Sequence, residues 1–384
     1  MTSNLMNSNA LCLEIEPMIQ AQTWQQSHAL ATPNSQWTAY LNQLCWQTLL
    51  PWLQEDYLPT ATVTPHVVSL PTFWELTTGT ALRLNDRRII LIPTETIDLD
   101  EFRIPQEWVD IPTWAGDYYL SAQVNPDEGW VRVAGLATHR QVKTQGLYDM
   151  GDRTYTLSDT DLTPDFSSIW VAQQLAPTEN LRSELSPIAA LSPTQADNLL
   201  ERLGNPTVLT PRLAVPFEQW AGLLNHGGWR QQLAERRWGV VGVRSPVQWL
   251  QSGLSTLAQS LGWQAVTLQP GMAGARGEGQ ESGVGWGQSL LIQDQPYELR
   301  LSCLDPAQNT WRFELQSLVP GGQIPTGFVL RLLTEDLQPF EGNEDRAMTP
   351  VDRLFLEVAL ESGEGLVWEV EPMPQGYDCE ILRF

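Results

Sequence analysis

Apolar and polar positions show no clear period over residues 1–35, where we expect only a short strand at Leu11–Ile15 followed by a loop. A helical period begins near Ser35, because apolar or small side chains then recur every three to four residues and form one stripe. The members of this stripe are Trp37, Leu41, Leu44, Thr48 and Trp52. Pro51 lies inside the pattern and is expected to kink or end the helix. The sequence therefore predicts one long helix with a buried stripe.

The period changes to two after Pro59, and the region that follows is typical of β-hairpins. The predicted strands are Ala81–Leu84, Ile89–Ile92, Phe102–Ile104, Trp108–Ile111, Asp117–Val124, Trp130–Ala137 and Thr154–Leu157. Asn125–Gly129 supplies the clearest turn, since proline presets the first turn position and glycine accepts a positive φ. Pro105 and Pro112 interrupt the two short strands, which suits the edge of a sheet. A helix around Phe166–Leu175 completes this part.

Helical patterns dominate after residues 176–191, which contain prolines and several serines and are interpreted as a linker. The predicted helices cover residues 193–203, 217–224, 229–237 and 247–261. The last has the strongest pattern, because five apolar residues step by three and four along one face; they are Val247, Leu250, Leu254, Leu257 and Leu261. We expect this face to be packed against the rest of the protein.

The carboxyl-terminal part is predicted to consist of strands. The candidates are Gln264–Leu268, Leu290–Gln293, Glu298–Leu304, Thr310–Val319, Phe328–Thr334, Leu354–Leu360, Leu366–Glu371 and Cys379–Phe384. Residues 298–304 and 310–315 alternate apolar with polar side chains, which is typical of antiparallel strands with one dry and one wet face. The number and spacing of the strands favour an antiparallel sandwich. Gly271–Gly287 interrupts this region and is interpreted as a glycine-rich loop.

These patterns together predict an α+β protein in three parts. Residues 1–180 form a mixed antiparallel-sheet and helix domain, residues 181–262 a helical middle segment, and residues 263–384 an all-β sandwich.

The charge balance limits the possible partners. The 384-residue chain carries 22 basic and 45 acidic residues, which gives a net charge of −23. Nucleic acids and anionic membranes are bound mainly through basic groups, so neither partner is expected. No apolar run is long enough to span a bilayer, and residues 1–10 lack the pattern of a secretory signal.

The reactive residue types are scarce and dispersed. Four cysteines and four histidines show no spacing that favours a metal site or a disulfide framework, which suits reduced thiols in a cytoplasm. Lys143 is the single lysine and follows Val142, so no phosphate-binding loop of the Gly-Lys-Ser/Thr type is present. We therefore predict no metal and no cofactor. Any chemistry through a lysine would depend on Lys143 alone.

Two longer motifs carry a resemblance to a known family. Residues 105–120 read PQEWVDIPTWAGDYYL, and residues 124–133 read VNPDEGWVRV. In these motifs, and from Gln288 to Phe384, the chain resembles the cyanobacterial domain-of-unknown-function family eighteen-twenty-two. The likeness leaves out residues 1–35 and the glycine-rich loop. It implies a cyanobacterial cytoplasmic protein and supplies no activity, cofactor or catalytic residue.

Carboxylates among aromatic rings are the candidates for catalysis. Glu107, Asp110 and Asp117 lie close in sequence to several tryptophans and tyrosines, and such surroundings can desolvate an acid of the kind that cleaves sugars. The alternative interpretation is that they are edge-strand charges beside core aromatics.

Tryptophan is the candidate for partner binding. The chain has 17 tryptophans, and the helical segment contains several of them. Tryptophan is enriched where proteins contact each other, and it also fills cores. The candidates for partner contact are Trp220, Trp229, Trp238 and Trp249.

The sequence favours a non-enzymatic protein-interaction or regulatory module with a protein partner, since no motif for a metal, a nucleotide or a nucleophile is present. The alternative is a carboxylate-dependent hydrolase that acts on a neutral, carbohydrate-like substrate.

Overall fold

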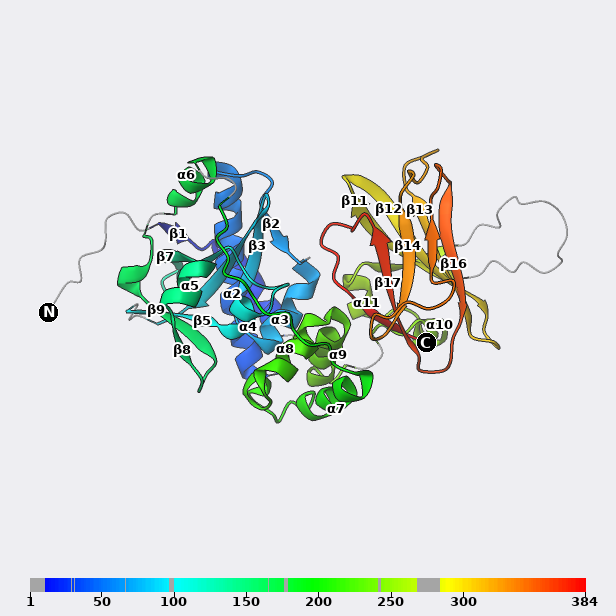
Figure 1. The fold of residues 1–384 in the computed structure, drawn as a ribbon, viewed down its shortest axis with the longest axis horizontal. Coiled ribbons are helices and arrows are strands. Elements are labelled where there is room, and N and C mark those ends of the chain that lie inside the picture. Colours follow the sequence, from blue (N-terminus) through cyan, green and yellow to red (C-terminus); the bar gives the residue numbers. More distant parts are fainter. Residues whose placement is uncertain are drawn as a thin grey trace. The chain divides into compact units, whose positions relative to one another are not determined.

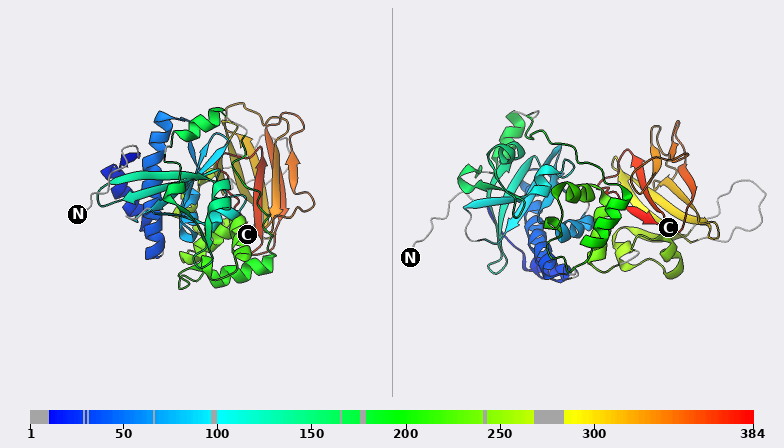
Figure 2. Two further views of the ribbon diagram at one scale, coloured as in Figure 1. Left: turned by 60° about the vertical axis from the view of Figure 1, so that its left-hand side comes forward. Right: turned by 60° about the horizontal axis from the view of Figure 1, so that its bottom comes forward.

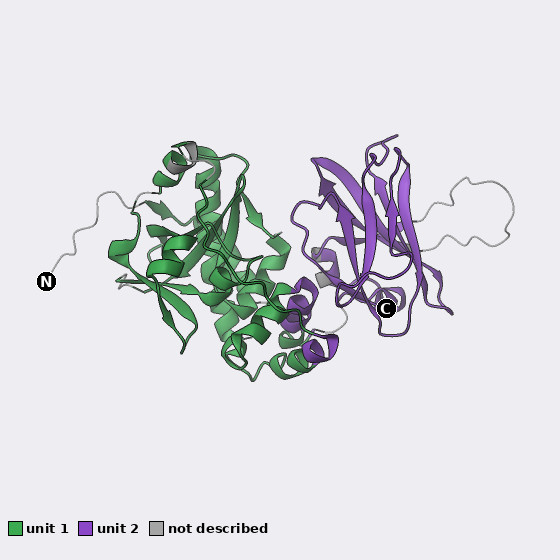
Figure 3. Cartoon of the chain, viewed as in Figure 1, with its two compact units in different colours: residues 1–191, 198–225, 236–239 green, residues 192–197, 226–235, 240–384 purple. Residues whose placement is uncertain are grey.

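The computed structural model describes residues 11–28, 30, 32–65, 67–96, 100–164, 166–175, 179–240, 243–267 and 284–384. The chain divides into two compact units (Figure 3). The first unit comprises residues 1–191, 198–225 and 236–239, and the second comprises residues 192–197, 226–235 and 240–384. Helices and strands are both abundant, so the fold is α+β as predicted. The three-part division at residues 180 and 262 stays a prediction. The structure divides the helical residues between the two units.

The first unit is built on a sheet with the strand order β1-β7-β6-β4-β3-β2. Its strands are β1 (Cys12–Glu14), β2 (Thr62–Thr64), β3 (Thr80–Leu84), β4 (Arg87–Thr94), β6 (Tyr118–Asn125) and β7 (Trp130–Thr138). The β3–β4 and β6–β7 hairpins confirm the two predicted ones. β4 and β6 run parallel, so the chain must cross between them outside the sheet. That crossover carries the candidate carboxylates.

A second sheet in this unit has the order β5-β9-β8, with β5 (Glu101–Pro105), β8 (Leu147–Asp149) and β9 (Thr154–Ser158). The helices are α1 (Pro17–Ser27), α2 (Pro33–Asp56), α3 (Leu70–Leu76), α4 (Gln106–Asp110), α5 (His139–Gln145) and α6 (Ser168–Leu175). Figures 1 and 2 show α2 lying along the large sheet. Leu44, Leu49 and Leu53 of this helix share a core with Leu91 and Leu120 of the sheet.

Four local predictions for this unit differ from the structure. Residues 17–27 form α1 rather than a loop, and Pro17 occupies its first turn, where the missing N–H costs nothing. The strand predicted over Trp108–Ile111 is wrong, because residues 106–110 form α4, with a hydrogen bond from Gln106 to Asp110 one turn apart. Trp37 is 38% exposed and does not belong to a buried stripe. α2 also continues through Pro51 to Asp56.

The helices after the predicted linker are α7 (Pro193–Leu203), α8 (Phe217–Asn225), α9 (Gly227–Arg237), α10 (Pro246–Ser252) and α11 (Thr256–Ser260). The predicted helix over residues 247–261 is wrong, because the chain turns between α10 and α11. Gly253 takes a φ of 79° there, which L side chains rarely adopt. Leu250 is 41% exposed, so the predicted apolar face is not buried along its whole length.

The second unit contains two antiparallel sheets, with orders β10-β11-β12-β13-β16 and β15-β14-β17-β18. The strands are β10 (Trp263–Thr267), β11 (Val284–Ile292), β12 (Gln295–Asp305), β13 (Thr310–Ser317), β14 (Val329–Thr334), β15 (Glu344–Arg346), β16 (Arg353–Ala359), β17 (Gly365–Glu371) and β18 (Ile381–Arg383). Both sheets contribute to one core, for example through Trp311 and Phe313 from one and Trp368 from the other. Residues 271–283 of the predicted glycine-rich loop lie outside the described residues, and residues 284–287 belong to β11 rather than to a loop.

Candidate functional site

The crossover from β4 to β6 positions the three candidate carboxylates. Glu107 and Asp110 lie on α4, three residues apart, and Asp117 directly precedes β6. Glu107 is completely buried, Asp117 is 5% exposed, and Asp110 is partly exposed. Each carboxylate is bound by a different cation.

Glu107 accepts three hydrogen bonds. Arg212 donates from Nε at 2.9 Å and from Nη2 at 2.8 Å, and the indole Nε1 of Trp220 donates at 2.8 Å. Burial lowers the pKa of Arg212, but the hydrogen bonds and the charge of Glu107 raise it by more, so its net shift is upward. Arg212 also donates to the backbone oxygens of Asp152 and Arg153. Glu107 therefore joins α4 to residues about a hundred positions further along the chain.

Asp110 forms a closed triangle with Lys143 and Tyr155. Lys143 Nζ donates to Asp110 Oδ1 and to the Tyr155 hydroxyl oxygen, both at 2.7 Å, and that hydroxyl donates to Asp110 Oδ2 at 2.9 Å. Burial lowers the pKa of Lys143, but its bonds to Asp110 and Tyr155 raise it by more. The only lysine is thus held as a cation, whereas Schiff-base chemistry needs a neutral amine.

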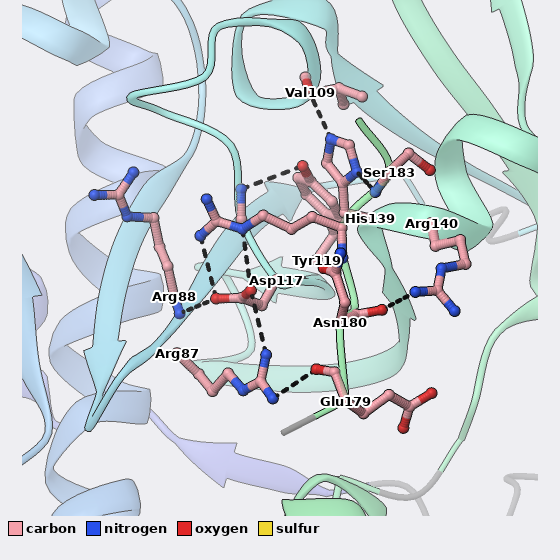
Figure 4. A network of polar contacts seen from close by, with 12 residues as sticks. Arg87, Arg88, Val109, Asp117, Tyr119, His139, Arg140, Glu179, Asn180 and Ser183 are labelled. Carbon is pink, nitrogen blue, oxygen red and sulfur yellow. Dashed lines mark hydrogen bonds and ion pairs between the residues drawn. The ribbon is translucent and has the colours of Figure 1, made fainter. Parts of the chain in front are cut away.

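Asp117 helps to hold residues 179–183 against other parts of the first unit, to which this segment itself belongs (Figure 4). Its carboxylate accepts Arg182 Nε at 3.0 Å, Arg182 Nη2 at 3.2 Å and the backbone N–H of Arg88 at 2.7 Å. Arg87 and Arg140 donate to the backbone oxygens of Glu179 and Asn180. We call residues 179–183 the strap.

His139 binds the last residue of the strap, Ser183 (Figure 4). Its ring is fully buried, its Nδ1 accepts the backbone N–H of Ser183 at 3.1 Å, and its Nε2 lies 2.9 Å from the oxygen of Val109. An Nδ1 that accepts leaves the proton on Nε2, so this ring is neutral and both nitrogens are used. His139 therefore has a structural role, and neither of its ring nitrogens is available as a general base.

His139, which accepts a hydrogen bond from the strap, makes the stability of the first unit depend on pH. Burial lowers the pKa of His139 from 6.5, nearby Arg182 and Lys143 lower it further, and the Val109 oxygen and Asp110 oppose this. The unfolded chain therefore takes up a proton first as the pH falls. The contribution of the neutral ring is complete above about pH 6.5 and decreases below it.

We expect the urea midpoint to fall between about pH 7 and about pH 5.5, and to fall less in H139N. The control is H28N, which replaces an exposed histidine. An equal fall of the urea midpoint with pH in the wild type and in H139N would contradict the role of His139 in this pH dependence.

No group of three or more His, Cys, Asp or Glu side chains within the described ranges is arranged to hold a metal ion. Cys45 is buried, and burial raises the pKa of its thiol, so it packs in the core rather than acting as a thiolate.

The predicted partner-binding tryptophans are mostly interior. Trp220, Trp229 and Trp249 are at most 3% exposed. Trp238 is partly buried and donates from Nε1 to Glu75 at 3.0 Å. A buried ring offers no surface to a partner, so the indoles of Trp220, Trp229 and Trp249 serve packing and internal hydrogen bonds. Partner contact through Trp238 stays a prediction.

Exposed tryptophans occur instead on α1 and α2. Trp24 is 48% and Trp37 38% exposed. Trp24 packs edge-on against Tyr40, with ring centroids 5.1 Å apart, and against His28 at 4.4 Å, while Trp37 lies 5.4 Å from Tyr40. We call Trp24, His28, Trp37 and Tyr40 the aromatic platform.

Sequence reasoning missed the platform because Trp37 fits the helical period of α2 and residues 17–27 were expected to be a loop. The available signal was Trp24 itself, an isolated aromatic in a stretch rich in glutamine. A tryptophan there has few apolar neighbours in sequence to bury it.

The second unit contains a hollow of about 700 Å³ lined in part by Trp249, Trp263 and Trp286. The buried Nε1 of Trp263 has no hydrogen-bond partner within the part of the chain that the structure describes. This hollow contains none of the candidate carboxylates.

The fold and these contacts define a mixed α+β protein of two compact units, and none of its described helices is long and apolar enough to cross a membrane. The model of a family described as "Protein of unknown function (DUF1822)" matches residues 13–383. The chain belongs to this family, as its motifs predicted. No curated protein and no solved structure matches it.

Proposed function

We propose that the protein is a non-enzymatic interaction module whose aromatic platform contacts a protein partner. The observation that carries this proposal is the exposure of Trp24 and Trp37 beside each other, with ring centroids 6.3 Å apart. Indole rings bury a large area with few rotatable bonds, which makes them frequent centres of binding energy.

The state of the carboxylates supports a non-enzymatic role over a carbohydrate-directed hydrolase. A hydrolase of that kind needs one carboxyl group that donates a proton and a second that acts as nucleophile or base. Glu107, Asp110 and Asp117 instead accept hydrogen bonds from Arg212, Lys143 and Arg182. Their oxygens are occupied by the protein's own cations and stabilise the fold.

The test is recovery of a partner from extract of the native host with the full chain. We expect a stoichiometric partner with the wild type and loss of at least about nine-tenths of it with W24A/W37A, because truncation of central aromatic rings weakens binding by roughly 2 kcal/mol or more. The matched control is W130A, which removes another surface tryptophan. Circular dichroism should show that all three proteins keep the same fold.

Equal recovery with the wild type and W24A/W37A would refute the role of the platform. Recovery of the chain alone, without any partner, would refute the interaction module.

A further inference from the structure

The platform combines an exposed aromatic face with a carboxylate. Trp37 donates from its indole Nε1 to Glu95 Oε2 at 2.5 Å, and Glu95 is exposed. The face of an indole ring carries a negative electrostatic potential that attracts cations. A carboxylate at the ring edge adds a full negative charge to the same surface.

The chain contains a comparable arrangement in which a cation is present. Trp130 donates from its indole Nε1 to Glu128 at 2.8 Å, and the guanidinium of Arg132 lies 5.8 Å from the centre of its ring. This site contains an indole, a carboxylate on its N–H and a cation over its face. The platform has the first two parts in Trp37 and Glu95.

Within the described part of the chain, no arginine or lysine side chain lies over the rings of Trp24 or Trp37. The chain has no lysine and no arginine before Arg83, and both α1 and α2 lie in that stretch. Cation–ring contacts occur at Trp130, Tyr155 and Phe355, and among the described residues none involves Trp24 or Trp37. Acidic residues do occur in the same stretch, so its charge is negative.

We infer that the platform binds an arginine or lysine side chain from a basic segment of the partner protein. The cation lies over the exposed faces of Trp24 and Trp37, and Glu95 is its counter-ion. The net charge of −23 attracts such a segment at a distance, and the rings give the contact its position. This inference rests on the proposed function, because it names the chemistry of the partner at the same surface.

The experiment measures the anisotropy of a fluorescent peptide of alternating glycine and arginine with the full chain at about physiological salt. We expect W24A/W37A to weaken binding by about 10-fold and E95Q by about 3-fold. W130A should bind as the wild type does. A peptide with glutamate in place of arginine should not bind.

Equal binding of the arginine peptide to the wild type and W24A/W37A would overturn the inference, since attraction would then come from net charge alone. Failure of the arginine peptide to bind would also overturn the inference of a basic partner segment. If partner recovery from extract still depended on Trp24 and Trp37 in that case, the proposed interaction module would stand. Sedimentation of the wild type as a dimer, with W24A/W37A monomeric, would make a second copy of this chain the occupant and overturn the basic partner.

Discussion

Replacing Glu75 by glutamine is expected to lower the free energy of unfolding by about 3–5 kcal/mol, the usual cost of breaking a buried ion pair on one side. Arg237 donates from Nε to Glu75 Oε1 at 2.7 Å, and their side chains are 2% and 0% exposed. The second carboxylate oxygen accepts the indole N–H of Trp238. A glutamine amide can accept at only one of these two positions and leaves the guanidinium buried without a counter-charge.

The size of this effect follows from what Arg237 holds in place. Its Nη1 donates to the backbone oxygens of Leu203 and Val208, both at 3.1 Å. One side chain therefore joins α3 to the end of α7 and to the loop after it. Loss of the counter-charge at Glu75 weakens all three attachments together.

The measurement is urea unfolding followed by circular dichroism, with a double-mutant cycle of E75L, R237M and E75L/R237M. The double variant removes both charges, so it should be more stable than at least one of the single variants. A decrease in the free energy of unfolding below about 1 kcal/mol for E75Q would contradict the role of the buried Glu75–Arg237 ion pair, because exposed ion pairs contribute that little.

Replacing Glu107 by glutamine is expected to cost about 3 kcal/mol for a related reason. All three hydrogen bonds at this carboxylate come from N–H groups of Arg212 and Trp220, so the group must act as an acceptor at both oxygens. The NH₂ of glutamine would face one of these donors. The guanidinium would also lose its ion-pair partner.

The matched control for E107Q is E101Q on neighbouring β5. Glu101 pairs with Arg103, but both side chains are more than half exposed. We expect this variant to keep the wild-type urea midpoint. A Glu107 that served a reaction would give the opposite result for E107Q: an unchanged midpoint with loss of the activity.

Periodic patterns predicted the helices and strands well where the spacing of apolar residues matches the face that is buried in the structure. Eight of the nine strands β10 to β18 and both principal hairpins of the first unit were found in this way, whereas β15 was not predicted. The pattern failed over residues 247–261, since a perfect apolar spacing does not reveal that Gly253 adopts a positive φ. It failed over residues 106–110 because two flanking prolines and two aromatic or branched residues are equally typical of an edge strand and of a short helix.

The candidate site was predicted in part. Sequence alone placed Glu107, Asp110 and Asp117 in one region, but their partners Arg212, Lys143 and Arg182 are 33 to 105 residues away. No local pattern reports such pairs, because the fold brings them together. The prediction of exposed tryptophans was limited for a similar reason, since the identity of a residue does not tell which side of a helix faces the core.

The closed triangle of Lys143, Asp110 and Tyr155 has a consequence for chemical labelling. Because the chain has one lysine, a reagent that acylates amines has a single side chain to modify. That amine donates to two oxygens and stays protonated, whereas acylation requires the free base. The rate of labelling at this position therefore reports how often the Lys143 side chain leaves this triangle, so the native protein contains its own probe for local opening.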